Sequence, residues 1–408
     1  MAMAGSDQAA GWMMLDRFIY HRGEEGDCDG WCFPDESTAP LRATSSTSLG
    51  QPFDVAILHA EPPAVSRLYL RWPGDTKRRG AELAVAHRDL LLFRLVYFGL
   101  HLMFDAHRVQ TPPPLHHTNG LVRGSSPGHE DEFVAAQLAS ITKIPGPDDM
   151  MEAEVCMIRS RVSATDDDGT WELHKIPIQH KEHQYWRLVD WSTSAVTTFN
   201  NRICWISYYT GGILFYDVFA ETPTISYLGL LTHHRPGYRE RGFLEVNRSI
   251  CVTGGGDLLK YASVVRTDGR LCGPLEPRQG YKIITDVLKA TESVDMEWDR
   301  DTFVTAYEFW RHNTSERLPR DAVPKYPLVS MDDPRIIHFL LSEEREKINK
   351  VSVVTMDMVT NKIISVVPYI NGEEDLDGED ADMVREKSHL LKSFLTSEFP
   401  KFLNLTRY

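Results

Sequence analysis

Histidines are the residues of this chain whose type and spacing most suggest chemistry. They form two adjacent pairs and a looser trio: His116-His117, His233-His234, and His174, His180 and His183. Imidazoles can bind a metal ion or exchange protons near neutral pH. Neighbouring side chains on a strand point to opposite faces, so an adjacent pair cannot easily share one ligand. We therefore expect no metal or catalytic site at these positions, although His233-His234, close to Arg235 and Arg239, would suit an anionic ligand in a loop.

Other short motifs also lack the partners that their chemistry requires. Cys28 and Cys32 lie four residues apart, but no second close pair completes a zinc site. Asp166–Gly169 opens like a calcium loop, yet Pro177 stands where the loop needs Glu. Gly254-Gly255-Gly256 is not followed by the Lys of a phosphate-binding loop and is predicted to be a turn. The sequence therefore predicts no catalytic residue, no cofactor and no metal.

Composition and charge restrict the classes of partner. The chain has 408 residues, of which 42% are hydrophobic, enough to bury a sizeable core. Its 58 acidic and 44 basic residues give a formal net charge of −14, which opposes general binding to nucleic acid. The apolar run around Asp89–Met103 is too short to span a bilayer, and the N-terminus does not read as a secretory signal. We expect a soluble protein of the cytoplasm or nucleus, without membrane association.

Secondary structure, which would position any functional site, is predicted most clearly in Asn200–Leu230. Arg202–Tyr209 and Ile213–Val218 are rich in Ile, Trp, Tyr and Phe, which favour strands. Gly211 and Gly212 can adopt the positive φ of a tight turn, so the two runs predict a β-hairpin. Trp205 is expected to pack in the core and Asp217 to serve as a turn or cap partner.

Similar strand signals recur along the chain. The predicted strands are Trp12–His21, Phe53–His59, Val65–Trp72, Leu83–His87, Leu91–Phe98, Glu154–Val162, Thr170–Ile178, Tyr185–Asp190, Ala195–Phe199, Ser249–Thr253, Leu258–Val265, Tyr281–Ala290, Phe303–Trp310, Val351–Met358 and Lys362–Pro368. Pro334–Lys347 could form either a helix or a buried strand. Many short strands with Gly- and Asp-marked turns favour an all-β fold. Total length and turn spacing suit a β-propeller-like body of six or seven irregular blades, with a pair of sandwiches as the alternative.

The domain limits follow from changes in composition. Residues 1–10 are predicted to be a disordered tail, and 11–370 to form the β-propeller-like body. Within the body, 105–131 read as a long surface loop and as its most plausible internal boundary. Residues 371–408 combine an acidic segment with a C-terminal amphipathic helix, because Met383, Leu390 and Phe394 recur at near-heptad spacing. That helix is expected to pack on the body, with partner binding as the alternative.

An ordered set of short motifs runs along the chain: Trp12–Phe18, Phe33-Pro34-Asp35-Glu36, Ala60-Glu61-Pro62-Pro63, Ser66-Arg67-Leu68-Tyr69, Cys204-Trp205-Ile206, Gly212-Ile213-Leu214, Asp217-Val218, Pro327-Leu328-Val329-Ser330 and Asp333-Pro334. Together these motifs resemble a plant family expanded in grasses, domain of unknown function 1618 (DUF1618). Ser207 stands where an acid is expected after the Cys-Trp pair, and Tyr216 replaces a small residue or Cys. The family is similar in style to F-box-associated and kelch-like propellers.

The resemblance implies an intracellular propeller-like interaction domain and supplies no catalytic residues. No F-box-like helical module precedes Phe53, which weighs against a direct role in a ubiquitin ligase. Two functions follow as hypotheses. The first is a protein-interaction scaffold or adaptor without catalysis, which predicts no convergent titratable cluster in any pocket. The alternative is an enzyme or small-ligand binder that uses polar loop residues at the propeller mouth, and it predicts carboxylates or histidines converging in one concave site.

Overall fold

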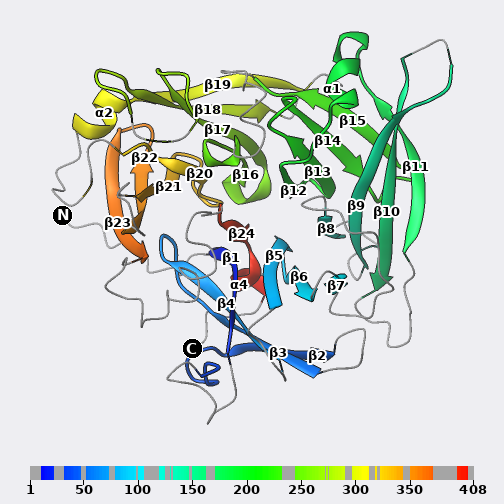
Figure 1. Ribbon diagram of the computed structural model, residues 1–408, viewed down its shortest axis with the longest axis horizontal. Coiled ribbons are helices and arrows are strands. Elements are labelled where there is room, and N and C mark those ends of the chain that lie inside the picture. Colours follow the sequence, from blue (N-terminus) through cyan, green and yellow to red (C-terminus); the bar gives the residue numbers. More distant parts are fainter. Residues whose placement is uncertain are drawn as a thin grey trace, which may run out of the picture.

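The computed structural model is mostly β-strand, with a few short helices, and its sheets curl into a nearly closed arrangement (Figure 1). The described residues are 11–22, 32–46, 52–72, 79–97, 100–104, 119–124, 129, 132–146, 149–161, 171–231, 244–271, 273, 275–289, 296–311, 318, 322–342, 350–370 and 393–402. The four sheets contain runs of consecutive antiparallel strands. This confirms the β-rich class predicted from the strand signals.

Two sheets are four-stranded antiparallel meanders. One contains β16 (Arg248–Thr253), β17 (Leu258–Arg266), β18 (Tyr281–Lys289) and β19 (Glu297–Thr305). The other contains β20 (Lys325–Val329), β21 (Ile336–Ser342), β22 (Val351–Asp357) and β23 (Lys362–Ile370). Buried Lys260 of β17 joins them, since its Nζ donates to Asp301 Oδ2 at 2.7 Å and to the Pro334 carbonyl at 2.6 Å.

An eight-stranded sheet holds two further meanders. The first is β8 (Asn119–Arg123), β9 (Glu132–Lys143), β10 (Met151–Arg161) and β11 (Glu172–Gln179). The second is β12 (Ala195–Phe199), β13 (Arg202–Ser207), β14 (Gly212–Asp217) and β15 (Thr224–Gly229). Their last strands, β11 and β15, pair in parallel, with Ile178 opposite Ile225. The predicted hairpin is therefore the centre of the second meander.

The remaining sheet combines the N-terminal strands with the last strand of the chain. Its order is β2 (Leu41–Ser46), β3 (Pro52–Leu58), β4 (Val65–Arg71), β1 (Met13–His21), β5 (Arg79–His87), β6 (Leu90–Tyr97) and β7 (Leu100–Phe104). β24 (Leu395–Ser397) pairs antiparallel with the start of β1, and β4 pairs with β1 in parallel. Thus the two ends of the described chain meet in one sheet.

The first strands of successive groups gather around a common centre (Figure 1). β5 contacts β8, β8 contacts β12, β12 contacts β16, and β16 contacts β20. β24 lies against both β1 and β5. The largest buried cluster unites β1 with the last two meanders, and the hydroxyl of Tyr369 in β23 donates to Asp16 Oδ2 at 2.8 Å. The sheets therefore nearly close on themselves through contacts between the two ends of the chain.

Several sequence-based expectations were wrong in detail. Tyr185–Asp190 is a helix, α1 (Tyr185–Val189), because a 3₁₀ turn at Glu182–Gln184 initiates it and the Lys181 N–H donates to Gln184 Oε1 at 2.8 Å. Phe303–Trp310 divides between β19 and α2 (Ala306–Arg311), where Glu308 accepts from the Thr305 N–H at 2.8 Å. In both places local capping outweighs the β-propensity of the aromatic residues.

The structure also tests the predictions for the loop 105–131, the C-terminal segment and the ambiguous segment Pro334–Lys347. Residues 119–123 of the expected loop 105–131 form β8, which is buried and paired with β9. The ambiguous segment contains strand β21 at Ile336–Ser342. The expected C-terminal helix lies largely outside the described residues, but Leu395, directly after Phe394, belongs to β24 and is followed by α4 (Phe399–Phe402). Edge pairing with β1 decides that end of the segment.

Candidate functional site: the axial cavity

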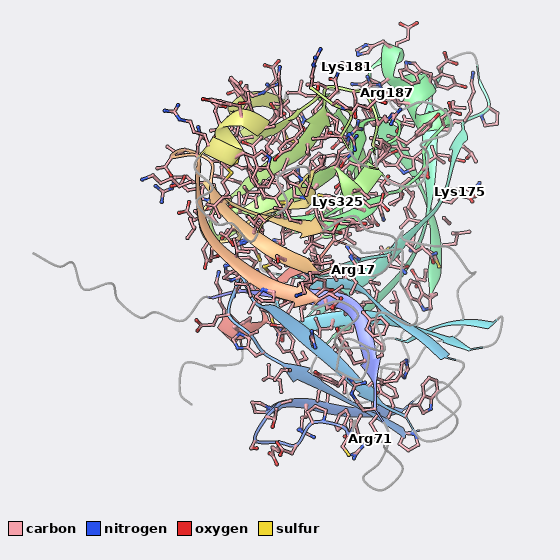
Figure 2. All side chains as sticks on the ribbon, turned by 60° about the vertical axis from the view of Figure 1, so that its left-hand side comes forward. Arg17, Arg71, Lys175, Lys181, Arg187 and Lys325 are labelled. Carbon is pink, nitrogen blue, oxygen red and sulfur yellow. The ribbon has the colours of Figure 1, made fainter. Side chains whose placement is uncertain are left out.

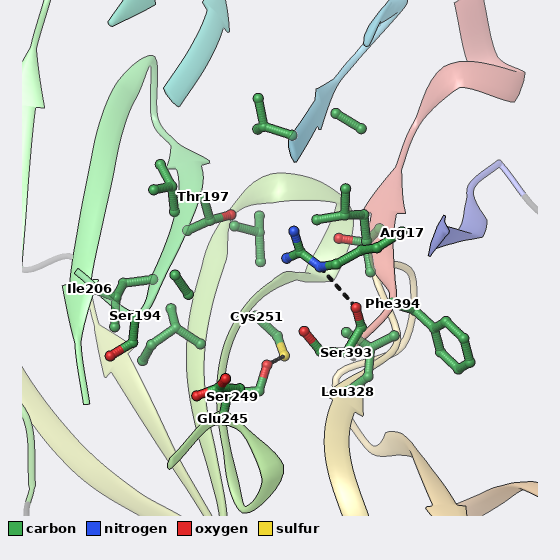
Figure 3. A pocket seen from close by; sticks show the side chains of 18 of the residues that line it. Arg17, Ser194, Thr197, Ile206, Glu245, Ser249, Cys251, Leu328, Ser393 and Phe394 are labelled. Atoms are coloured by element: carbon green, nitrogen blue, oxygen red, sulfur yellow. Dashed lines mark hydrogen bonds between the residues drawn. The ribbon is translucent and has the colours of Figure 1, made fainter. Parts of the chain in front are cut away.

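A cavity of about 180 Å³ lies where the first strands converge (Figure 3). Its wall comes from segments spread over the whole chain, in β1, β5, β8, β12, β13, β16, β20 and β24. Figure 2 places Arg17 of β1 near the middle of the molecule, whereas Lys175 and Lys181 lie at its edge. We refer to this space as the axial cavity.

A second cavity of about 400 Å³ continues the axial cavity along the strands. The two share Ala86, Thr197, Val252 and Thr396 in their walls. In β5, β12, β16 and β24, the earlier residues line the first space and the later residues line the second. These strands therefore run in the same direction along one channel. Their C-terminal ends form the wider mouth, around Asn200-Asn201, Gly255–Asp257 and Glu398.

Strand edges, not only side chains, form the cavity wall. Unbroken runs of residues line it: 84–86, 194–197, 248–252 and 393–396. Successive side chains on a strand point to opposite faces, so an unbroken run lines a cavity only where the strand edge faces it. β12 and β16 are end strands of their sheets as described. The cavity is therefore bordered by backbone N–H and C=O groups, which require hydrogen-bond partners.

Arg17 shows how one side chain meets this requirement. Its Nε donates to the Ser393 carbonyl at 2.9 Å, and its Nη1 donates to the Ala84 carbonyl at 3.1 Å. The guanidinium thus connects the segment just before β24 with β5 and projects into the cavity (Figure 3). Arg248 makes a similar contact from the opposite wall, since its Nη1 donates to the Tyr208 carbonyl at 3.0 Å. Both cations are held by neutral carbonyl groups of the cavity wall.

Hydroxyl and thiol groups complete the lining. Ser194 Oγ accepts from the Tyr208 N–H at 3.2 Å, and Ser249 Oγ lies 3.1 Å from Cys251 Sγ. Burial raises the pKa of the Cys251 thiol, which also accepts a hydrogen bond from the Val329 N–H at 3.3 Å. A thiol with a raised pKa is a poor nucleophile. Cys251 is therefore a packing residue of the wall.

The wider mouth holds the imidazole of His87. Its Nδ1 accepts a hydrogen bond from the Arg123 N–H at 3.1 Å. Burial, followed by the charge of Arg88, lowers the pKa of His87 to about 3. The ring is therefore neutral at physiological pH and acts as a fixed acceptor. The carboxylate of Glu398, at the same mouth, binds Lys401 at 2.8 Å.

The described part of the channel does not bring together an acid, a base and a nucleophile. The axial cavity has Glu245 as its one described carboxylate, and the wider mouth has Asp257 and Glu398. A search of the described residues found no group of three or more His, Cys, Asp or Glu side chains able to hold a metal. The described residues also contain no helix long and apolar enough to cross a membrane.

Among the described residues, the histidines and cysteines selected from the sequence are not assembled into a site. His116, His117, His233 and His234 lie outside the described residues. His174 pairs with Glu172 at 3.0 Å on an exposed part of β11, and His180 contacts the Lys181 carbonyl at 3.1 Å. Cys28 is also outside the described residues, whereas Cys32 is disulfide-bonded and so is not a free thiolate ligand.

Trp205 and Gly211 have the structural roles expected of them, whereas Asp217 faces a cation across the hairpin instead of serving a turn or a cap. Trp205 is fully buried and stacks on Tyr216, with ring centroids 5.6 Å apart. Gly211 has φ +72°, as the turn requires, and Asp217 faces Arg202 across the hairpin at 3.5 Å. Gly254–Gly256 forms the predicted turn between β16 and β17.

Sequence reasoning missed the residues of the axial cavity. Thr197 and Thr396 belong to no motif, and Arg17, although it lies within the motif Trp12–Phe18, was given no role there. The three residues come from segments far apart in the chain. One signal was available: Arg17 is a charged residue inside the apolar strand Trp12–His21. A cation in such a strand has to find acceptors, and here it finds them on two other strands.

Comparison with known proteins gives one family match. Residues 205–338 match the model described as "Protein of unknown function (DUF1618)". The search of curated proteins found no match. Among solved structures, a "putative 6-phosphogluconolactonase" from Bacteroides fragilis aligns with 11% identity and a TM-score of 0.30, covering 74% of this chain and 84% of that one. Another from Bacteroides uniformis has 10% identity and a TM-score of 0.28, covering 79% of each chain.

The two structural likenesses are too weak to support a conclusion about fold or activity. The family match extends from β13 to β21 and contains the later motifs of the resemblance, such as Gly212-Ile213-Leu214 and Asp333-Pro334. The earlier motifs, before residue 205, lie outside the matched segment. The comparison therefore shows a similarity to the DUF1618 model over residues 205–338.

Proposed function

We propose that this chain is a plant intracellular interaction protein, a scaffold or adaptor without catalysis, built on a β-propeller-like body. The plant origin and the adaptor role come from the resemblance in the sequence. The proposed body has six sectors. They are β1–β4 with β24, β5–β7, β8–β11, β12–β15, β16–β19 and β20–β23. The contacts between successive first strands support this reading.

A surface on α1 is the observation that carries the interaction role. Trp186 and Val189 are 48% and 55% exposed, and residues three apart on a helix share one face. Exposed Leu231 is close by, because Arg187 Nη1 and the Leu230 N–H donate to the same carbonyl, that of Gly211, at 2.8 and 2.9 Å. We call Trp186, Val189 and Leu231 the α1 surface.

The chemistry of the α1 surface is typical of protein contacts. The guanidinium of Arg187 lies over the Trp186 ring, 5.1 Å from its centroid. Trp and Arg are enriched among the residues that contribute most to binding energy at protein interfaces. The channel, in contrast, offers no described set of convergent acid and base groups, which favours recognition over catalysis.

Affinity purification from plant tissue tests this function. The double variant Trp186→Ala/Val189→Ala removes the aromatic anchor and its neighbour. We expect the amount of a stoichiometric protein partner to fall at least tenfold, as a loss of about 1.4 kcal/mol or more implies. The matched control is Tyr307→Ala, which truncates a side chain 73% exposed on α2. A partner retained equally by both variants, or a small molecule recovered without any protein, would contradict the proposal.

A further inference from the structure

The axial cavity is suited to a ligand by the nature of its wall. Strand edges contribute backbone donors and acceptors side by side, and the interspersed side chains include hydroxyl-bearing and aliphatic groups. Such a wall contrasts with an apolar void, which stays empty of water because nothing in it can hydrogen-bond. The wall therefore suits a molecule that can both donate and accept hydrogen bonds.

Strand β16 shows the backbone groups that face the ligand space. The Asn247 carbonyl accepts from the Val264 N–H at 2.8 Å. Along an antiparallel strand, the N–H and C=O groups of successive residues point alternately toward and away from the partner strand, so those of residues 248, 250 and 252 point away from β17. The Ile250 N–H points this way and donates to the hydroxyl of Tyr208 at 3.0 Å. Val252, the next residue with this orientation, lines both cavities. Its N–H and C=O therefore face the channel.

Two threonines mark the junction of the cavities. Thr197 of β12 and Thr396 of β24 line both spaces, and their hydroxyls have no hydrogen-bond partner among the described residues. The Thr197 hydroxyl points toward the interior, on the side of Arg17 (Figure 3). A hydroxyl is at once a donor and an acceptor, so it matches another hydroxyl in either role.

The charge and size of the cavity narrow the ligand class. Three of the described side chains in the cavity wall carry a formal charge: Arg17, Arg248 and Glu245. The two arginines already donate hydrogen bonds to carbonyl groups. A neutral molecule enters this site without leaving a buried charge unbalanced. A volume of about 180 Å³ holds a compact molecule with roughly a dozen heavy atoms, not a folded peptide.

We propose that the axial cavity binds a small, neutral, polyhydroxylated molecule, which enters from the wider mouth. Its hydroxyls would bond to Thr197, Thr396 and the strand edges, and its carbon skeleton would pack on aliphatic side chains such as Ile206 and Leu328. The site lies at the centre of the molecule, whereas the α1 surface lies on its periphery. Ligand binding and partner binding are therefore separable by mutation.

Saturation-transfer NMR on the full chain tests the proposal with three probes: myo-inositol, D-glucose and cyclohexanecarboxylate. We expect signal transfer to at least one of the two polyols and none to the carboxylate. The variant Thr197→Val keeps the β-branched shape and removes one hydroxyl, so we expect affinity to fall about threefold to tenfold. The variant Thr197→Phe fills the junction and is expected to abolish the signal.

Controls distinguish this site from the protein surface. Thr224→Val makes the same change at the start of β15, outside both cavities, and is expected to leave the polyol signal unchanged. Unfolding curves confirm that each variant is folded. The proposal is overturned if neither polyol gives a signal, if Thr197→Phe leaves the polyol signal intact, or if the carboxylate alone binds.

Discussion

Buried polar side chains show at the residue scale why single positions are so constrained in this protein. His338 of β21 is almost fully buried, and its Nδ1 lies 3.0 Å from Thr355 Oγ1. The ring also packs against Trp12, with centroids 5.8 Å apart. Burial lowers the pKa of His338 to about 4. The folded protein thus holds a neutral imidazole between its first strand and its last meander.

This imidazole gives the folded state a specific dependence on pH. The unfolded chain binds a proton at His338 near the ordinary pKa of 6.5, whereas the folded chain binds it only near 4. Protonation therefore favours unfolding. The contribution of His338 is fully present above pH 6.5 and is lost as the pH falls toward 4, by up to about 1.4 kcal/mol per unit.

The variant His338→Phe keeps an aromatic ring and removes the titration. We expect its free energy of unfolding in urea to depend less on pH between 6.5 and 4 than that of the wild type. His174→Gln, an exposed position on β11, is the control and should follow the wild-type curve. Parallel curves for the wild type and His338→Phe would show that His338 does not titrate with the predicted shift.

Turns and close contacts at glycines determine how neighbouring strands pair. The hairpin between β13 and β14 needs Gly211 for its positive φ and Gly212 for space. A Cβ on Gly212 would overlap the ring of Tyr227, whose hydroxyl donates to the Gly211 carbonyl at 3.2 Å. The first requirement is visible in the sequence. The second depends on β15 lying beside β14.

Substitution of Gly212 by Ala is therefore expected to destabilise the protein by about 1–3 kcal/mol, since the added methyl group must displace a buried ring. The matched control is Gly146→Ala, where a Cβ meets no atom within 4 Å, with an expected change below about 0.5 kcal/mol. Urea unfolding monitored by circular dichroism measures both. Equal stabilities of the two variants would contradict the close contact between Gly212 and Tyr227.

Closure of the sheets depends, at the scale of the whole molecule, on contacts between the chain ends. Asp16 of β1 is only 5% exposed, and its carboxylate accepts from the Phe18 N–H at 2.9 Å and from the Tyr20 hydroxyl at 3.3 Å. The third donor is Tyr369 of β23, 353 residues away. A buried carboxylate needs its full set of donors.

Removal of the Tyr369 hydroxyl should therefore weaken closure. For Tyr369→Phe we expect a loss of about 1–3 kcal/mol in the free energy of unfolding, because Asp16 loses a buried hydrogen bond to a charged group. Tyr307→Phe removes a hydroxyl from a side chain that is 73% exposed and should have almost no effect. The comparison uses urea unfolding at pH 7, and an unchanged midpoint for Tyr369→Phe would refute a role in closure.

The local structure of this protein could be predicted from its amino-acid sequence. The alternation and β-propensity of runs such as Arg202–Tyr209, and the glycines between them, act over a few residues, so they predicted strands and hairpins. The prediction of a strand was wrong at Tyr185–Val189, because a capping hydrogen bond between Lys181 and Gln184 favours a helix there. The absence of a complete catalytic motif was also visible.

Which strand edges meet could not be predicted from the sequence, because it depends on packing between distant segments. Arg17 acquires its role because Ala84 and Ser393, the latter 376 residues away, present carbonyls to it in the axial cavity. Such contacts depend on how buried faces of separate sheets pack, and no local propensity encodes that packing. The histidines that first suggested chemistry are not gathered into a site, as far as they are described. The candidate site is instead made of backbone edges and threonines that carry no motif.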